Sequence, residues 1–279
     1  MKKGDTAMKF SLLSWNVEAF KGKGTQLKSV AEHITKLDPD VFGLFEVENV
    51  NIISLITNHL PGYDYSLTDG PQNKEILVGV RKAKFEQSVF TQKREFKAYN
   101  PRLRPGAFLS LLLNNEFYNI LFLHTDSGTE AKSFGNRNEM FDKIWSLKKA
   151  LDKKATGHAG AKLIALGDLN TMGLRYPLNR KSNIRVSECA EVEALTKIAA
   201  KRKMVLLKKE FDVTYNNGRL TGDLDHILAT GNITFKQLGL TNGNPFFVNV
   251  TGWQQLKGSK RKEFIETISD HCSLYCEIT

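Results

Sequence analysis

The stretch Leu163-Ile-Ala-Leu-Gly-Asp-Leu-Asn170 decides the fold of this chain more clearly than any other. Its aliphatic residues predict a short buried strand, and Gly167 ends the apolar run. Asp168 and Asn170 follow, and they are expected to point the same way because they alternate with Leu169. Sheets place functional groups at the carboxyl ends of their strands, so the stretch predicts a sheet with a site at its edge. An Asx turn after the glycine is the structural alternative.

Five further apolar runs also end in acidic, amide or histidine residues. They end at Ser14-Trp15-Asn16, Leu44-Phe45-Glu46, Leu123-His124, Leu224-Asp225-His226 and Ser269-Asp270-His271. Taken singly, Asn16 fits a strand-end cap, and either histidine fits a hydrogen-bonded core residue. Six such junctions in one chain are difficult to attribute to packing alone. Together they predict one catalytic site assembled from several strands.

Apolar patterns along the rest of the chain predict an α/β fold. Strands are expected over residues 10–17, 41–47, 76–80, 85–90, 107–113, 118–124, 163–166, 224–228, 233–240 and 273–278. Helices are expected over 25–37, 52–60, 137–151 and 188–200. This many strands with only a few long helices favours two sheets packed face to face with helices outside.

The 279 residues contain no visible linker, repeat or low-complexity tract. We therefore expect a single domain over residues 1–279, with residues 1–8 as a disordered tail. The three cysteines, Cys189, Cys272 and Cys276, form neither a spaced metal pair nor an even disulfide framework, which favours a reducing compartment. No export signal is visible, and no stretch approaches the roughly 20 apolar residues of a membrane span. We expect a cytoplasmic monomer without stable membrane insertion, although secretion by another route stays open.

The charge of the chain favours a polyanionic partner. Forty lysine and arginine residues against 30 acidic residues give a net charge of +10. Nucleic acid is the first expectation and an anionic membrane surface the second. Residues 245–262 interleave aromatic and basic side chains, as binding to nucleic acid requires, which makes Trp253, Lys260, Arg261 and Lys262 candidates. The alternative is a buried hairpin followed by a solvated loop.

The residue types at the six junctions suit hydrolysis of a phosphodiester. That reaction needs a divalent cation, a base for the attacking water and donors that stabilise the developing charge. Glu46 and Asp270 offer the hard oxygen ligands that Mg²⁺ or Mn²⁺ prefers. Asp168 can accept a proton, while Asn170 can orient water or phosphate. Histidines paired with carboxylates are acid–base candidates.

The six motifs, in this order, resemble those of the endonuclease/exonuclease/phosphatase superfamily, also called DNase-I-like. The resemblance covers residues 10–278, and the motifs are weak singly but strong in order. Glu46-Val-Glu-Asn49, Asn136-Arg137 and the run 222–229 are most similar to the nuclease branch related to large secreted bacterial nucleases. This finer resemblance adds Arg137 to the candidate nucleic-acid-binding residues.

The resemblance implies a four-layer α/β sandwich, in which two mainly antiparallel sheets are flanked by helices, and Mg²⁺-dependent phosphoester hydrolysis. Metal binding is implied for Glu46, Asn16 and Asp270, and activation of water for Asp168 and Asn170. His124 and His271 would contact the scissile phosphate. Each would be oriented by a carboxylate, Asp225 for His124 and Glu75 for His271.

Two features depart from the pattern of the superfamily. Some members place a tyrosine just before the strand that begins with the glutamate, whereas Gln72-Asn73-Lys74 stand here, so the acid for the leaving group is unassigned. In the loop His124-Thr-Asp-Ser-Gly128, Asp126 is an additional carboxylate. It fits either a second cation or a cap of the turn, and we favour the turn.

The superfamily includes nucleases, abasic-site endonucleases, tyrosyl-DNA phosphodiesterases, inositol-polyphosphate phosphatases and sphingomyelinases, so the fold does not decide the substrate. Positive charge favours a nuclease that acts on DNA. A lipid or small-molecule phosphoesterase is the alternative, and residues 245–250 are the only candidate for a membrane-contacting hairpin. A non-catalytic polyanion-binding module would have lost metal or base residues, and none of the six motifs is lost.

Overall fold

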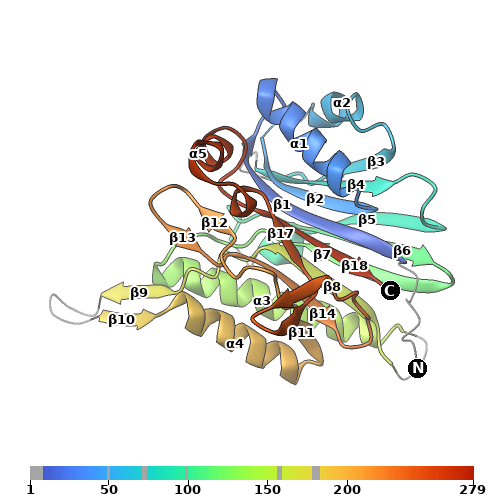
Figure 1. Cartoon of the computed structure of the whole chain (residues 1–279). Coiled ribbons are helices and arrows are strands. Elements are labelled where there is room, and N and C mark those ends of the chain that lie inside the picture. The colour runs from blue at the N-terminus through green and yellow to red at the C-terminus, as the bar shows by residue number, and fades with distance from the viewer. Residues whose placement is uncertain (1–8, 49–50, 71–73, 98–99, 156–158, 178–182) are drawn as a thin grey trace.

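Two six-stranded sheets form the centre of the protein (Figure 1). The computed structural model describes residues 9–48, 51–70, 74–97, 100–155, 159–177 and 183–279. In order, the first sheet contains β17 (Asn249–Thr251), β18 (Ser273–Ile278), β1 (Phe10–Phe20), β2 (Val41–Val47), β4 (Glu75–Arg81) and β3 (Tyr63–Leu67). The second contains β11 (Met204–Leu206), β14 (Asp225–Thr230), β8 (Lys162–Asp168), β7 (Glu116–Phe122), β6 (Gly106–Leu113) and β5 (Gln87–Lys93). Within both sheets, the parallel pairs are β1–β2 and β7–β8, and the other neighbours are antiparallel.

Helices cover the outer faces of the two sheets. The helices α1 (Gly24–Leu37) and α2 (Ile52–Thr57) lie beside the first sheet, and α3 (Ala131–Asp152) and α4 (Glu188–Lys201) lie beside the second (Figure 1). One buried cluster contains side chains of both sheets, and a second joins the outer face of the second sheet to α3 and α4. This helix–sheet–sheet–helix order confirms the predicted four-layer α/β sandwich.

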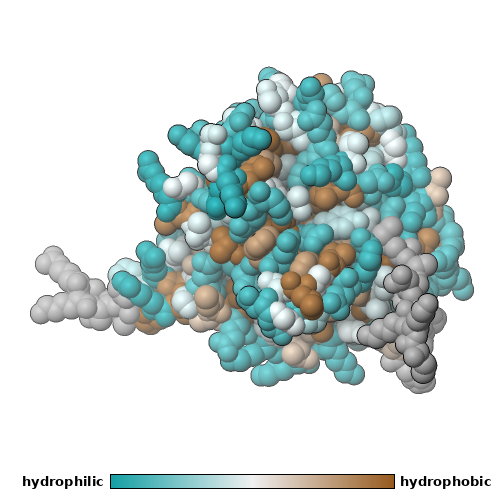
Figure 2. Space-filling view, viewed as in Figure 1, coloured by the Kyte–Doolittle hydropathy of each residue, from teal (hydrophilic) through white to brown (hydrophobic). Residues whose placement is uncertain are grey.

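Smaller elements surround these layers. They are η1 (Arg94–Lys97), β9 (Leu174–Pro177), β10 (Asn183–Val186), β12 (Tyr215–Asn216), β13 (Thr221–Gly222), β15 (Gly239–Thr241), β16 (Asn244–Phe246), η2 (Trp253–Gln255) and α5 (Gly258–Thr267). None of the helices in the described ranges is long and apolar enough to span a membrane. Hydrophilic side chains cover most of the face in Figure 2, with hydrophobic residues in smaller patches between them.

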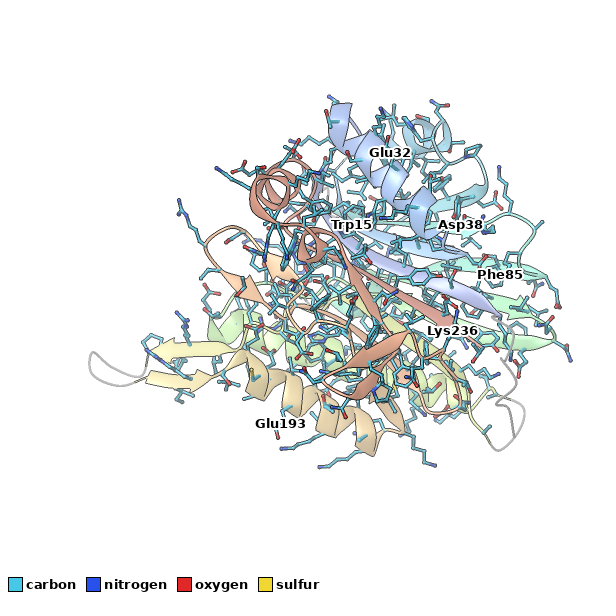
Figure 3. All side chains as sticks on the ribbon, in the orientation of Figure 1. Trp15, Glu32, Asp38, Phe85, Glu193 and Lys236 are labelled. Carbon is cyan, nitrogen blue, oxygen red and sulfur yellow. The ribbon has the colours of Figure 1, made fainter. Side chains whose placement is uncertain are left out.

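The amphipathic pattern of α1 shows why these sequences form these layers. Leu27, Val30 and Ile34 recur at helical spacing and are buried, while Glu32 lies on the outer face of the helix (Figure 3). The helix ends at Leu37. The next residue, Asp38, adopts the left-handed conformation, and its N–H donates to the Ile34 carbonyl. Trp15 of β1 lies below, with its ring 4.5 Å from that of His33 on the helix.

The predicted strand over 233–240 was wrong. In this range only Phe235 forms an isolated bridge, to Ile278, and β15 begins at Gly239. Alternation of apolar and polar residues makes a strand possible, but pairing requires a free partner edge. Residues 258–267, where no helix was predicted and where the alternative interpretation placed a solvated loop, form α5, which buries Phe264 and is otherwise rich in charge. The predicted tail over 1–8 lies outside the described residues, as do Asn49, Gln72 and Asn73.

Candidate active site

Strand pairing brings the six predicted junctions to one end of the two sheets. Asp225, the first residue of β14, lies directly opposite Asp168, the last residue of β8. His124 lies just beyond β7, which runs parallel to β8, and the N–H of its neighbour Thr125 donates to the Asp168 carbonyl. In the other sheet, Asn16 of β1 pairs beside Phe45, next to Glu46 of the parallel strand β2. The register of the strands therefore assembles the site.

Asp168 lies at the centre of these side chains. Its Oδ2 accepts a hydrogen bond from the Asn16 amide at 3.0 Å and lies 3.4 Å from His124 Nε2 and 3.8 Å from His271 Nε2. Only 2% of the residue is exposed. Burial raises the pKa of Asp168 to about 7, and Asp225 adds to the rise while His271 opposes it. This carboxyl can therefore gain or lose a proton near neutral pH.

Asp168 and Asn170 combine the two arrangements that their sequence allowed. Oδ1 of Asp168 accepts the Asn170 N–H at 3.1 Å, as in an Asx turn. Its other oxygen nevertheless faces Asn16 and the two histidines. Asn170 has a φ of 46°, and its amide nitrogen donates to the Thr125 carbonyl at 3.2 Å. The turn thus fixes both side chains at the site.

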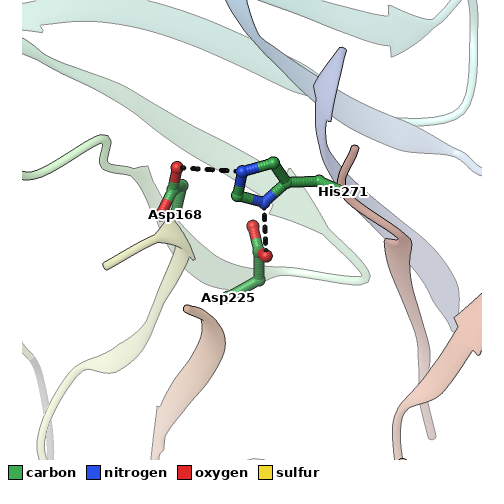
Figure 4. A group of neighbouring side chains, drawn as sticks. All are labelled: Asp168, Asp225 and His271. Carbon is green, nitrogen blue, oxygen red and sulfur yellow. Dashed lines mark hydrogen bonds and ion pairs between the residues drawn. The ribbon is translucent and has the colours of Figure 1, made fainter. Parts of the chain in front are cut away.

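Asp225 pairs with His271 and not with His124, which corrects the predicted pairing. Oδ2 of Asp225 lies 2.8 Å from Nδ1 of His271 (Figure 4). Burial lowers the pKa of His271, but Asp225 and Asp168 outweigh it and raise the pKa to about 10. Without bound ligands, this ring is therefore an imidazolium at neutral pH.

Among the described residues, His124 has no carboxylate partner at Nδ1. Nδ1 is buried and forms no hydrogen bond with any described residue. Burial, reinforced by the positive charge of Arg104, lowers the pKa of His124 well below its usual value, so this ring is neutral. The two histidines of the site therefore differ in charge.

Glu75 was predicted to orient His271, but the structure places its carboxylate elsewhere. As the first residue of β4, it accepts hydrogen bonds from Thr68 Oγ1 at 2.6 Å and from the Gly70 N–H at 2.9 Å. Pairing of β3 with β4 directs this carboxylate toward the loop that follows β3. No contact between Glu75 and His271 occurs in the described part of the chain.

Glu46 and Asp270 form the more exposed rim of the site, with 16% and 15% of their side chains exposed. Glu46 has a φ of 60° at a shift in strand register, an irregularity that can re-aim a side chain. Burial opposes ionisation of Glu46, but the Lys74 ammonium at 2.7 Å lowers its pKa overall. Burial raises the pKa of Asp270 to about 6, and the nearby carboxylates of Glu18 and Glu46 add to the rise although His271 opposes it.

With this geometry established, comparison with known proteins identifies the family. Residues 13–271 match the model of the Endonuclease/Exonuclease/phosphatase family. The chain belongs to this family. Members of the family are hydrolases that act on phosphoester bonds and generally use divalent metals. No curated protein sequence matches the chain.

Solved structures of family members share the fold at low sequence identity. TDP2 of D. rerio, complexed with a single-strand DNA product, has 15% identity and a TM-score of 0.64, with 97% of this chain and 98% of that chain covered. The mannosyl-6-phosphatase Bt3783 of Bacteroides thetaiotaomicron has 15% identity and a TM-score of 0.62, with coverage of 97% and 99%. The human Nocturnin catalytic domain has 15% identity and a TM-score of 0.61, with coverage of 97% and 94%.

Arg137 and Trp253 are not placed to contact nucleic acid, contrary to prediction. Arg137 is fully buried, where its guanidinium donates to both carboxylate oxygens of Glu191 and to the Gly173 carbonyl. Trp253 is also fully buried, and its Nε1 donates to the Asp270 carbonyl at 2.9 Å. Sequence alternation cannot distinguish a ring that stacks on a base from one that supports a catalytic loop.

Three side chains near the site were missed in the sequence of this family member. Arg104 interacts electrostatically with Glu46 and Asp168, and its Nε is buried without a hydrogen-bond partner among the described residues. Lys74 holds Glu46, and the ring of Tyr215 lies 5.0 Å from that of His271. Basic and aromatic residues outside the six motifs gave no signal, because loops and the short strand β12 bring them to the centre.

The carboxylate of Asp126 accepts a hydrogen bond from the Asn136 amide at 2.7 Å, at the start of α3. Its backbone carbonyl also accepts a hydrogen bond from Arg137 at 3.3 Å. These contacts fix the loop against the helix, and they favour the turn over a second cation site in this member of the family.

Proposed function

We propose that this protein is a divalent-metal-dependent phosphodiesterase that cleaves nucleic acid, with DNA as the favoured substrate. The observation that carries the proposal is the environment of Asp168. This buried carboxyl, with a pKa of about 7, lies between Asn16, neutral His124 and cationic His271. A general base works best when its pKa lies near the working pH, so Asp168 suits the removal of a proton from water.

The oxygen donors on the rim fit a hard divalent cation such as Mg²⁺ or Mn²⁺. The carboxylates of Glu18, Glu46 and Asp270 repel one another enough to help raise the pKa of Asp270 to about 6, and a bound cation would remove this repulsion. Their partial exposure suits Mg²⁺, which keeps several water ligands. We therefore assign the cation to Glu46 and Asp270, with Asn16 beside them.

A second group of side chains could also hold a cation by geometry. One ligand atom each from Asp168, Asp225 and His271 lies within 4.8 Å of the others. These residues are buried, and Nδ1 of His271 is already paired with Asp225. A ring held as an imidazolium has no free lone pair for a metal, so the rim is the better site.

The residues of the chain supply the remaining chemistry. A cation held by Glu46 and Asp270 would neutralise charge on the phosphoryl oxygens. Asp168 takes the proton of the attacking water as the water oxygen bonds to phosphorus, and Asn170, fixed by the Thr125 carbonyl, orients that water or the phosphate. The bond from phosphorus to the leaving oxygen breaks, and the leaving oxygen takes a proton from solvent water. His271 directs its cationic Nε2 edge toward the same space and stabilises the charge that builds on phosphorus-bound oxygens.

The choice of nucleic acid rests on charge and on the surface near the site. A net charge of +10 favours a polyanion over a neutral lipid or a small phosphate ester. The hairpin that a membrane-acting enzyme would need is not free, because Phe246 and Val248 are 7% and 0% exposed. Binding of a DNA product by the structurally similar TDP2 of D. rerio is consistent with this choice.

A substrate panel tests the proposal. The purified protein is incubated with single-stranded DNA, duplex DNA, RNA, sphingomyelin vesicles, mannose 6-phosphate and bis(p-nitrophenyl) phosphate, each with Mg²⁺, Mn²⁺ or excess chelator. We expect cleavage of DNA and of the chromogenic diester, only with metal. The matched control is Asp168→Asn, which keeps the side-chain shape and removes the base.

Three outcomes would contradict the proposal. Hydrolysis that persists in chelator excludes the metal, and hydrolysis restricted to vesicles or to the sugar phosphate excludes nucleic acid. Full activity of Asp168→Asn excludes the assigned base.

A further inference from the structure

A basic surface, separate from α5, lies beside the active site. Arg94 and Lys97 on η1 line it, and Arg102 directly follows Pro101, which also lines it. Two adjoining hollows of about 370 Å³ and 450 Å³ share Arg94 and Lys97 in their walls. The smaller is completed by Asp69, Gly70 and Gln92, and the larger by Glu95, Asn100, Pro101 and Lys143. The surface is therefore concave and long enough for more than one small group.

A short series of neighbouring residues leads from this surface to the catalytic centre. Gly70 lines the smaller hollow, and a Cβ added there would lie 3.2 Å from both the Glu75 carboxylate and the Pro105 ring. Pro105 directly follows Arg104, whose positive charge interacts with Glu46 and Asp168. The hollows therefore lie on the side of the catalytic centre from which Arg104 approaches.

The three cations of the surface have no ion-pair partner among the residues that the structure describes. The neighbouring charges are mostly neutralised, since Lys93 lies 3.5 Å from Glu95 and Lys143 lies 2.9 Å from Glu139. Asp69 is the remaining acid in the smaller hollow. The surface thus has a net positive charge from Arg94, Lys97 and Arg102, available to an anionic partner.

The basic residues of α5 are less available than their sequence suggested. Lys262 lies 3.7 Å from Glu266, and the Arg261 guanidinium lies 4.7 Å from the centre of the Trp253 ring. Lys260 is the cation of this trio without such a partner among the described residues. Two of the three positive charges on α5 are therefore already engaged within the protein.

We propose that Arg94, Lys97 and Arg102 bind backbone phosphates of a nucleic-acid strand that extends from the active site on this side. The proposal rests on the proposed function and adds the direction in which the substrate leaves the catalytic centre. The chemistry is sequence-independent, because flexible cations that meet phosphates read charge and spacing and make no contact with bases. Substrates with several phosphates on this side bind better than a single diester.

Charge-removing variants test this proposal against α5. Arg94→Gln/Lys97→Gln/Arg102→Gln is compared with Lys260→Gln/Arg261→Gln/Lys262→Gln, since each variant loses three positive charges from a net charge of +10. Affinity for a 20-nucleotide single strand is measured against salt concentration in Ca²⁺ with Asp168→Asn as the background. Each phosphate contact contributes about −0.7 to the slope of log affinity against log salt for single strands, so the first variant should flatten the slope by about 2. The α5 variant should flatten it by less than half of that.

Turnover with Mg²⁺ completes the test. In the otherwise wild-type protein, the first triple variant should raise the KM for the oligonucleotide at least tenfold, while hydrolysis of bis(p-nitrophenyl) phosphate stays within twofold. The proposal would be overturned if both triple variants lost the same affinity for the oligonucleotide, or if the α5 variant lost more. It would also be overturned if the first variant lost activity equally on the oligonucleotide and on bis(p-nitrophenyl) phosphate. Binding to anionic lipid vesicles but not to the oligonucleotide would overturn it as well. If the wild type cleaves no nucleic acid, the proposed function fails; if it cleaves nucleic acid and the first variant keeps wild-type affinity, only this inference fails.

Discussion

Replacement of Asp225 by asparagine should lower the pKa of His271, so that the ring holds its proton less tightly. The carboxylate lies 2.8 Å from Nδ1, and together with Asp168 it raises the pKa of the buried ring from 6.5 to about 10. That difference corresponds to a preference of about 5 kcal/mol for the imidazolium. An opposite charge at this distance typically accounts for a change of one to three pH units, so the pKa of His271 should fall by about two.

The assay is an NMR titration of the imidazole Cε1–H signals in the presence of chelator. Asp270→Asn is the matched control, because that carboxylate lies 3.8 Å from Nε2 of the same ring, and we expect a smaller fall in the pKa of His271 there. A pKa of His271 that changes by less than half a pH unit in Asp225→Asn would refute the reasoning. A larger fall in the Asp270 variant than in the Asp225 variant would refute it equally.

Three further predictions follow from other contacts. Burial raises the pKa of Asp168 from 3.8 to about 7, so without metal the stability that its protonated form contributes is lost as the pH rises from 4 to 7. Over this range Asp168→Asn should become more stable relative to wild type, by at most about 4 kcal/mol. A difference in unfolding free energy that does not change with pH would be the contrary result. Lys74→Gln should tighten Mn²⁺ binding several-fold by calorimetry, because the ammonium 2.7 Å from Glu46 competes with the cation, whereas weaker binding would show that Lys74 instead positions Glu46. Arg137→Met should lower the unfolding free energy by about 3–5 kcal/mol in chemical denaturation, since it leaves Glu191 buried without its partner, and a loss below 1 kcal/mol would contradict this.

The sequence predicted the layers of the fold because burial controls the pattern of long strands and helices. Strand Val41–Val47 was predicted with the bounds that the structure has, and the helix Glu188–Lys201 was predicted to within one residue. The helix α5 was missed because Phe264 is its buried residue and no apolar stripe marks it. The short hairpins β9–β10 and β12–β13 were missed because such strands depend on pairing more than on their own composition.

The sequence identified which residues gather at the site but not which of them pair. The pairing of Asp225 with His271 follows from the β8–β14 register and from the approach of the loop before β18, both of which depend on contacts between distant parts of the chain. Arg137 was predicted to bind nucleic acid from the resemblance to the nuclease branch. Its buried partner Glu191 cannot be recognised from spacing, because it lies 54 residues away. The same limit hid Arg104, which reaches the centre from a turn.

Single-turnover cleavage of an end-labelled oligonucleotide tests the central claim most directly. The wild-type protein and Asp168→Asn are compared with Mg²⁺ and with excess chelator, after circular dichroism has shown that both are folded. We predict cleavage by the wild type only with Mg²⁺, and a rate for Asp168→Asn that is lower by roughly 10²–10⁴, as expected for loss of a general base. Cleavage by the wild type in chelator at the full rate, or cleavage by Asp168→Asn within tenfold of the wild type, would contradict the claim that this cluster is a metal-dependent phosphodiesterase site.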